Sequence, residues 1–172
     1  MFKIIRNNLA NYLTVSNLIC GLISIYFSTQ GNYSYAVWFI LLGGLADMFD
    51  GKVARMTKTT SELGKYLDSN SDLITFGVAP ATLIFFAELQ PLAIYGWLVL
   101  LFYIICASYR LAKYNLMSVK GYFIGIPTTF AGPLLALSYF LTAWLPEWSY
   151  LIITLILGIS MVSGIKVKKV WY

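Results

Sequence analysis

Long apolar stretches separated by short polar connections dominate this 172-residue chain. A helix needs about 20 mainly apolar residues to cross a hydrocarbon core roughly 30 Å thick. Five stretches fit this description, the first two only if polar residues extend them, and the polar run 68–72 interrupts a further one near its start. We therefore expect six transmembrane helices, at residues 18–27, 33–46, 66–86, 92–107, 126–143 and 150–165.

Residues 1–12 precede the first apolar stretch and have an amphipathic pattern. Lys3 and Arg6 alternate at helical spacing with Phe2, Ile4 and other apolar residues. A basic amphipathic helix of this kind lies in the membrane interface, and a frayed terminus is the alternative. The expected fold is an all-α integral membrane domain, residues 1–172, with a short interfacial helix at 1–12.

The composition supports a membrane protein and narrows the chemistry. Hydrophobic residues make up 59% of the chain and charged residues 11%, with a mean hydropathy of +0.75, which excludes an ordinary soluble domain. Cys20 and Cys106 lie in apolar stretches without metal-ligand spacing. Because the chain has no histidine, the commonest general base is absent and catalysis must depend on carboxylates.

The basic residues predict the orientation in the membrane. If the six helices connect at 31–32, 57–60, 90–91, 120–121 and 146–147, all 12 lysines and arginines fall on one side. The opposite connections carry only the acidic residues Glu88 and Glu147. Because cytoplasmic loops are enriched in Lys and Arg, both termini are expected in the cytosol.

All four aspartates of the chain lie between positions 47 and 72. Asp47 and Asp50 are three residues apart, and Asp68 and Asp72 are four apart, so each pair occupies one side of a helix. An antiparallel helical hairpin brings the two pairs face to face. Four carboxylates in one place repel unless cations neutralise them, and oxygen ligands suit Mg²⁺, Mn²⁺ or Ca²⁺. Two divalent ions balance the four charges and can grip a pyrophosphate.

Small residues and an arginine accompany the aspartates. Gly51 and Ala54 continue the first polar stripe and Gly64 begins the second, which leaves room beside the carboxylates. Arg55, one turn beyond Gly51, can meet phosphate oxygens. A structural cation site and a carboxylate-lined ion path remain the alternatives at this stage.

The segment DMFDGKVAR, followed after eight residues by GKYLDSNSD, resembles the signature of the CDP-alcohol phosphotransferase family. Every fixed position of that signature is present: Asp47, Asp50, Gly51, Ala54, Arg55, Gly64, Asp68 and Asp72. The resemblance implies a six-helix membrane fold and a reaction in which an acceptor hydroxyl displaces CMP from a CDP-alcohol.

The resemblance also implies roles for individual residues. The four aspartates would hold the metal ions, and Asp72 would act as the base. Nucleotide contacts would lie around Asp47, Gly51, Ala54, Arg55, Gly64 and Asp68. Members of the family are generally homodimers, and no nucleic-acid partner is expected.

Further stretches are similar to the phosphatidylserine synthase branch of the family, namely LTVSNLICG, LDSNSDLITFGVAPA, YRLAKYN, FIGIPTTFAG and MVSGIK. Two departures are Thr129, where many relatives have proline, and Lys166, where arginine is common. Both lie near the expected acceptor site, so they weaken the assignment of the acceptor.

A serine acceptor needs a cationic partner for its carboxylate, and Arg110 is the best candidate, with Lys113, Lys120 and Lys166 behind it. A simple membrane anchor is the alternative for Arg110. Asn17 and Thr14 either line the nucleotide pocket or bond neighbouring helices.

The expected reaction is transfer of a phosphatidyl group from CDP-diacylglycerol or CDP-archaeol to L-serine, with release of CMP, in the cytoplasmic membrane of a prokaryote. Asp72 would accept the serine proton, and the active site would face the cytosol. The same chemistry with glycerol 3-phosphate or inositol phosphate is one alternative, and a cation channel or transporter is another.

Overall fold

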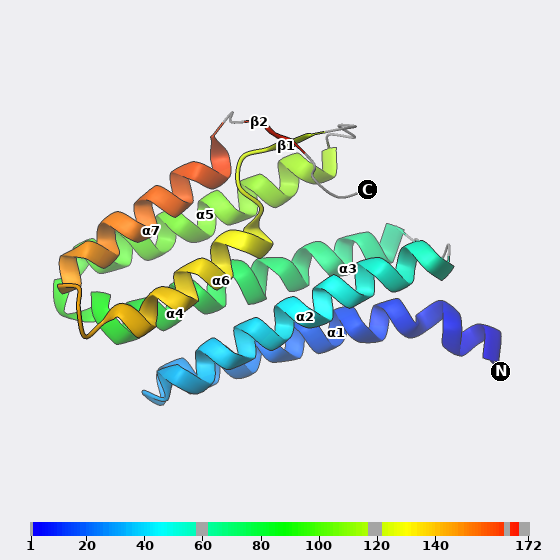
Figure 1. Cartoon of the computed structure of the whole chain (residues 1–172), viewed down its shortest axis with the longest axis horizontal. Coiled ribbons are helices and arrows are strands. Elements are labelled where there is room, and N and C mark those ends of the chain that lie inside the picture. Colours follow the sequence, from blue (N-terminus) through cyan, green and yellow to red (C-terminus); the bar gives the residue numbers. More distant parts are fainter. Residues whose placement is uncertain (1, 58–61, 117–121, 164–165, 169–172) are drawn as a thin grey trace.

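Helices that run back and forth form the fold of the chain, as seen in the computed structural model (Figure 1). The structure describes residues 2–57, 62–116, 122–163 and 166–168, and it describes side chains at 11–52, 62–116 and 125–163. The first helices are α1 (Phe2–Thr29), α2 (Tyr33–Thr57) and α3 (Glu62–Asp72). They are followed by the π-helical turn η1 (Leu73–Val78), α4 (Ala79–Ile84), η2 (Phe85–Leu89), η3 (Gln90–Leu92), α5 (Ile94–Leu116), α6 (Thr128–Ser138), η4 (Tyr139–Leu141) and α7 (Glu147–Val162).

Successive helical passages point in opposite directions. In Figure 1, α2, α5 and α7 run from left to right, whereas α1, the passage from α3 to η2, and α6 run from right to left. The end of α2, the start of α3, the end of α5 and the start of α6 therefore lie toward the same end of the bundle. The chain thus has the alternating course that the apolar pattern predicts.

Helices occur at all the expected stretches, but most extend beyond the apolar residues. α1 joins residues 2–12 and the first apolar stretch in one helix, without a break. α2 continues past residue 46 to include both of its aspartates, and α5 continues to Leu116. The extensions arise because hydropathy marks the apolar part of a helix, whereas backbone hydrogen bonding continues into polar sequence.

Three helices in the described part of the chain are long and apolar enough to cross a membrane, at Asn11–Thr29, Glu62–Leu92 and Ile94–Leu116. Thr128–Leu141 and Glu147–Val162 are shorter apolar helices. Large apolar side chains such as Leu42, Ile105 and Ile156 are exposed on the outside of the bundle. The molecule is therefore a helical protein whose apolar helices are compatible with a membrane.

The polar run 68–72 does not interrupt the helical segment from α3 to η2. It forms the second half of α3, and Ser71 and Asp72 are buried. The Ser71 hydroxyl donates to the carbonyl of Leu67 at 2.9 Å, within the same helix. Polar groups are tolerated at membrane depth when protein groups satisfy them, and Ser71 and Asp72 of this run face inward.

The π-helical turn η1 follows α3 directly. Pro80 has no backbone N–H, so it cannot bond the carbonyl of Phe76 four residues earlier. The buried Tyr103 hydroxyl of α5 donates to that carbonyl instead, at 3.3 Å. The helical segment from α3 to η2 is therefore bonded to α5 at the point where Pro80 cannot supply a backbone hydrogen bond.

The all-α expectation is confirmed, and one short pair of strands accompanies the helices. Two strands, β1 (Tyr122–Ile124) and β2 (Lys166–Lys168), pair antiparallel with Phe123 opposite Val167. Gly125 ends β1 with a φ of +74° and approaches the carbonyl of Met161, so the chain turns sharply into α6. Strands of three residues carry too little periodic pattern to be recognised in a sequence.

Candidate active site

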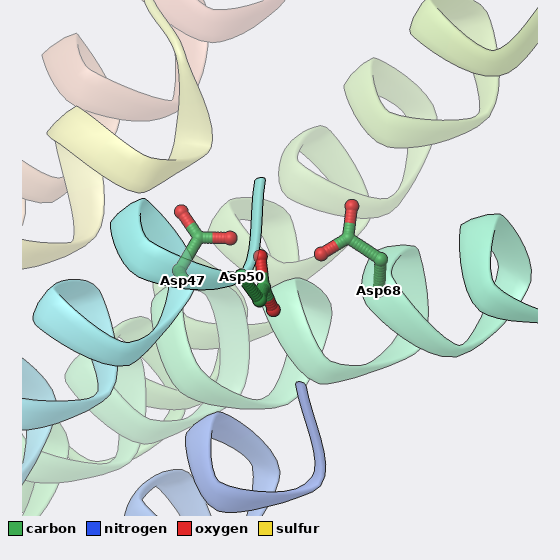
Figure 2. Close-up of side chains that lie close together, drawn as sticks. All are labelled: Asp47, Asp50 and Asp68. Carbon is green, nitrogen blue, oxygen red and sulfur yellow. The ribbon is translucent and has the colours of Figure 1, made fainter. Parts of the chain in front are cut away.

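Three of the four aspartates meet between α2 and α3. One carboxylate oxygen from each of Asp47, Asp50 and Asp68 lies within 4.8 Å of the others. Figure 2 shows Asp50 between the other two, with one oxygen of Asp47 and one of Asp68 turned toward the space between them. The helical hairpin of α2 and α3 therefore brings the two predicted pairs together.

Asp72 lies one helical turn beyond Asp68 and belongs to the same cluster. Its carboxyl group lies next to that of Asp47, and its side chain is 7% exposed. It is not among the three residues whose ligand oxygens converge most closely. The structure thus places three converging carboxylates, of which Asp50 is itself buried, beside a fourth.

Helix α1 supports the cluster from behind. The Thr14 hydroxyl donates to Asp50 Oδ2 at 2.8 Å, and both residues are buried. The Asn17 amide donates to Asp72 Oδ1 at 3.4 Å, a long hydrogen bond, and Asn17 is fully buried. These residues, one turn apart, bond two helices at once. The sequence left their roles open, and the structure places both against the aspartates.

The electrostatic neighbours of these carboxylates are chiefly one another. Asp47 is repelled mainly by Asp50, and Asp68 by Asp50 and Asp47. Two unit charges 4 Å apart interact by about 4 kcal/mol at an effective dielectric constant near 20. A cluster held this closely is stable as anions only when positive charge enters it.

The donor set suits a hard divalent cation. The converging ligand atoms of Asp47, Asp50 and Asp68 are all carboxylate oxygens, which Mg²⁺, Mn²⁺ and Ca²⁺ prefer. Helix backbones on two sides hold the three side chains, and Thr14 orients one of them. The residues present therefore fit a metal centre, with Asp72 beside it.

The space next to the aspartates is open at Gly51. This residue is exposed, and a Cβ atom placed on it would meet nothing within 4 Å. Packing of the described residues therefore does not require glycine here, and the space beside it has room for a bound molecule. Gly64 is half-buried on the first turn of α3. The side chains of Ala54 and Arg55 lie outside the described residues.

Arg110 faces the interior, near Asp72. It is 8% exposed, and its Nη1 donates to the Thr128 hydroxyl at 2.6 Å. The guanidinium lies 5.8 Å from the ring centroid of Tyr114, and it attracts the Asp72 carboxylate. Its Nε is buried and has no hydrogen-bond partner among the described residues. This position argues against a simple surface anchor and leaves a donor for an anionic group.

The structure adds contacts that the sequence analysis did not single out. The Thr75 hydroxyl donates to the backbone carbonyl of Asn17 at 2.9 Å. Near the start of α3, Asn115 Nδ2 donates to the Ser69 hydroxyl at 2.8 Å, and Lys65 donates to the carbonyl of Asn115 at 3.1 Å. Thr75 lies three residues beyond Asp72, a helical spacing that could have identified it. Asn115 had no comparable signal.

Comparison with known proteins agrees with this geometry. A sequence profile of the family described as CDP-alcohol phosphatidyltransferase matches residues 7–164. The CDP-diacylglycerol–serine O-phosphatidyltransferase of Bacillus subtilis is 39% identical over 159 residues, which cover 92% of this chain and 85% of the relative. Proteins of the same name from Methanocaldococcus jannaschii and Helicobacter pylori are 35% and 32% identical, over 94% and 91% of this chain and 74% and 70% of their own lengths. Because the match runs through both aspartate pairs and nearly the whole chain, this protein belongs to the CDP-alcohol phosphatidyltransferase family.

Proposed function

We propose that this protein transfers the phosphatidyl group of a CDP-diacylglycerol-type lipid to the hydroxyl of L-serine and releases CMP. The observation that carries the proposal is the convergence of Asp47, Asp50 and Asp68, with Asp72 beside them, in a chain of this family. The names of the relatives support serine as the acceptor. The lipid is CDP-diacylglycerol or its ether counterpart CDP-archaeol.

The proposed setting is the cytoplasmic membrane of a prokaryote. The whole chain acts as one domain with six spans, and residues 1–12 lie in the membrane interface. The alternating course of the helices and the position of the described basic residues Lys52, Lys65, Arg110 and Lys113 near one end support cytosolic termini and a cytosolic active site. We further propose a homodimer, as is general in this family.

Two divalent metal ions, Mg²⁺ or Mn²⁺ with Ca²⁺ as a further occupant, are the proposed cofactors. Their proposed ligands are Asp47, Asp50 and Asp68, whose oxygens converge, together with the neighbouring Asp72, and carboxylate oxygens suit these ions. When bound, the ions neutralise the carboxylates and stabilise the negative charge that develops on the phosphate oxygens and on CMP.

The nucleotide binds on the open side of the aspartates. Gly51 leaves space for it, and Gly64 lies across the hairpin on α3. Asp47, Asp68 and Asn17 contribute polar contacts, and the signature positions Ala54 and Arg55 complete the set. The lipid tails enter sideways from the bilayer, and the head group lies over the carboxylates.

Asp72 is the proposed base. It accepts the proton of the serine hydroxyl, the serine oxygen forms a bond to the lipid-bearing β-phosphorus, and the bond from that phosphorus to the CMP oxygen breaks. Its burial and the Asn17 amide hold the carboxylate in place. Direct transfer needs no covalent enzyme intermediate, because the base and the acceptor oxygen suffice for one displacement.

Arg110 is the proposed partner of the serine carboxylate. It is buried and lies near Asp72, and within the part of the chain that the structure describes its Nε has no hydrogen-bond partner. Hydrogen bonds to charged groups contribute about 1.5–3 kcal/mol. We expect Arg110→Gln to raise KM for serine by roughly tenfold or more, with KM for the CDP-lipid nearly unchanged, measured by initial rates of CMP release.

Lys113→Gln is the matched control for Arg110. It removes the same charge from the same helix, but the Lys113 amine lies 5.9 Å from the ring of Tyr109 and is only half-buried. The KM of Lys113→Gln for serine should stay near that of the unaltered protein. A normal serine KM in Arg110→Gln would exclude the proposed role.

CMP release by purified protein in detergent tests the function. CDP-diacylglycerol and Mn²⁺ are supplied with serine, glycerol 3-phosphate or inositol phosphate separately. Serine-dependent release of CMP supports the proposal. Release with another acceptor keeps the reaction class and overturns the assignment of serine and of Arg110. If no acceptor supports release, a cation channel or transporter becomes the leading hypothesis, tested by ion flux in proteoliposomes.

Removal of metal is a separate prediction. We expect EDTA to abolish CMP release and excess Mn²⁺ or Mg²⁺ to restore it, because the clustered aspartates cannot bind a pyrophosphate while their charge is uncompensated. The thermal midpoint of the same samples shows whether the fold survives chelation. Full activity in EDTA after extensive dialysis would contradict the metal proposal.

A further inference from the structure

Thr75 connects the π-helical turn η1 to α1 at the residue that also contacts Asp72. Its hydroxyl donates to the backbone carbonyl of Asn17 at 2.9 Å, while the Asn17 side chain donates to Asp72 Oδ1 at 3.4 Å. Thr75 and Asn17 are fully buried. Two groups on one passage, the Thr75 hydroxyl and the Asp72 carboxylate, thus bond to a single residue of α1.

Two glycines leave the space that the Thr75 side chain occupies. A Cβ atom on Gly21 would lie 2.5 Å from the Thr75 hydroxyl oxygen, and one on Gly43 would lie 2.6 Å from its methyl group. The same Cβ on Gly43 would lie 2.9 Å from Asn17 Oδ1. The Thr75 and Asn17 side chains are therefore packed tightly against the backbones of α1 and α2.

The backbone bond matters because the Asn17 side chain is held weakly. Its Oδ1 is buried and meets no hydrogen-bond donor from the described side chains and backbone, and its bond to Asp72 is long. The amide by itself therefore restrains the distance between α1 and Asp72 only loosely. The Thr75 hydroxyl adds a shorter bond, because a carbonyl oxygen has two lone pairs and accepts a second donor beside its own helix bond.

We infer that Thr75 is a positioning residue, which sets the place of Asp72 by bonding η1 to the Asn17 backbone. The inference rests on the proposed function, in which Asp72 is the base. Thr75 itself does not touch substrate. Loss of its hydroxyl lets η1 and α1 separate, so the carboxylate no longer meets the acceptor hydroxyl at the required geometry.

The test compares Thr75→Ala with Thr75→Ser, which differ only by the hydroxyl. We expect kcat for CMP release to be about tenfold lower in Thr75→Ala than in Thr75→Ser, since small misplacements of reacting groups are costly. KM for the CDP-lipid should change less than kcat, because Thr75 bonds the Asn17 backbone and the other nucleotide contacts lie on α2 and α3. Thr75→Val, which keeps the volume, replaces Thr75→Ala if the cavity prevents folding.

Ser24→Ala is the control for a merely structural bond. Ser24 is fully buried on α1, and its hydroxyl donates to the carbonyl of Ala36 on α2 at 2.9 Å, away from the aspartates. The variant Ser24→Ala should lower the thermal midpoint, as Thr75→Ala does, but its kcat should stay near that of the unaltered protein. Equal kcat in Thr75→Ala and Thr75→Ser, or an equal fall in Ser24→Ala, would overturn the inference.

Failure of the proposed function is visible separately, as a lack of CMP release by the unaltered protein with every acceptor. The same variants are then compared by Mn²⁺ affinity, measured by electron paramagnetic resonance without substrate. Weaker binding in Thr75→Ala than in Thr75→Ser and Ser24→Ala supports the positioning of Asp72, and equal affinities overturn it.

Discussion

Asp72→Asn is expected to lower kcat for serine-dependent CMP release by about 10³-fold, because general bases contribute roughly 10²–10⁴ to a rate. Asparagine has the size of aspartate but accepts no proton from the acceptor. It also removes one of the four proposed ligand groups, so metal affinity should fall as well. Both quantities can be measured on the same detergent-purified protein.

Glu147→Gln is the control for the loss of one carboxylate. Glu147 begins α7 at the opposite end of the bundle and is exposed. The activity and thermal midpoint of the variant Glu147→Gln should match those of the unaltered protein. A variant Asp72→Asn that retained more than about a tenth of kcat would show that another group takes the proton.

Gly43→Ala is expected to impair both stability and activity. The added methyl would lie 2.6 Å from the Thr75 methyl and 2.9 Å from Asn17 Oδ1, so α2 or these side chains must move. Overpacking of this kind costs about 1–3 kcal/mol, and a displacement near 1 Å at the site lowers the rate by about 10²-fold. The thermal midpoint and kcat should therefore fall together.

The neighbouring variant Gly44→Ala is the control, because it shows whether α2 tolerates an alanine in place of a glycine where there is room for the methyl group. A Cβ atom on Gly44 would lie 3.6 Å from the ring of Phe76, an ordinary contact. Alanine is favoured over glycine in a helix by about 1 kcal/mol, so this variant should be as stable as the unaltered protein or more so. Equal stability and activity in the two variants would contradict the close packing at Gly43.

Much of the site could be predicted because its chemistry lies in two short helical segments. The spacings of Asp47 with Asp50 and of Asp68 with Asp72 place each pair on one helix face in any α-helix. The rarity of acids elsewhere in an apolar chain indicated that they share a purpose. The structure confirms that Asp47, Asp50 and Asp68 converge across the hairpin.

Other features depend on contacts between residues far apart in the sequence. Arg110 could be an anchor or a ligand group by pattern alone, and its bond to Thr128 and its burial became evident only when α5 and α6 were packed together. The paired strands β1 and β2 join segments more than 40 positions apart. Residues 68–72 had too little hydropathy for a span, because hydropathy cannot distinguish a face turned to lipid from one turned to protein.

The sequence by itself determined the class of the protein, the alternating helical course, and the group of aspartates that can bind cations. These follow from composition, from apolar length and from helical spacing, which are local properties of the chain. Only the tertiary structure decided which aspartates converge, that Thr14 and Asn17 of α1 support them, and that Thr75 fits against Gly21 and Gly43. The physical reason is that close packing between two helices depends on the shapes of both surfaces. The sequence of one helix does not specify the surface that it meets on the other.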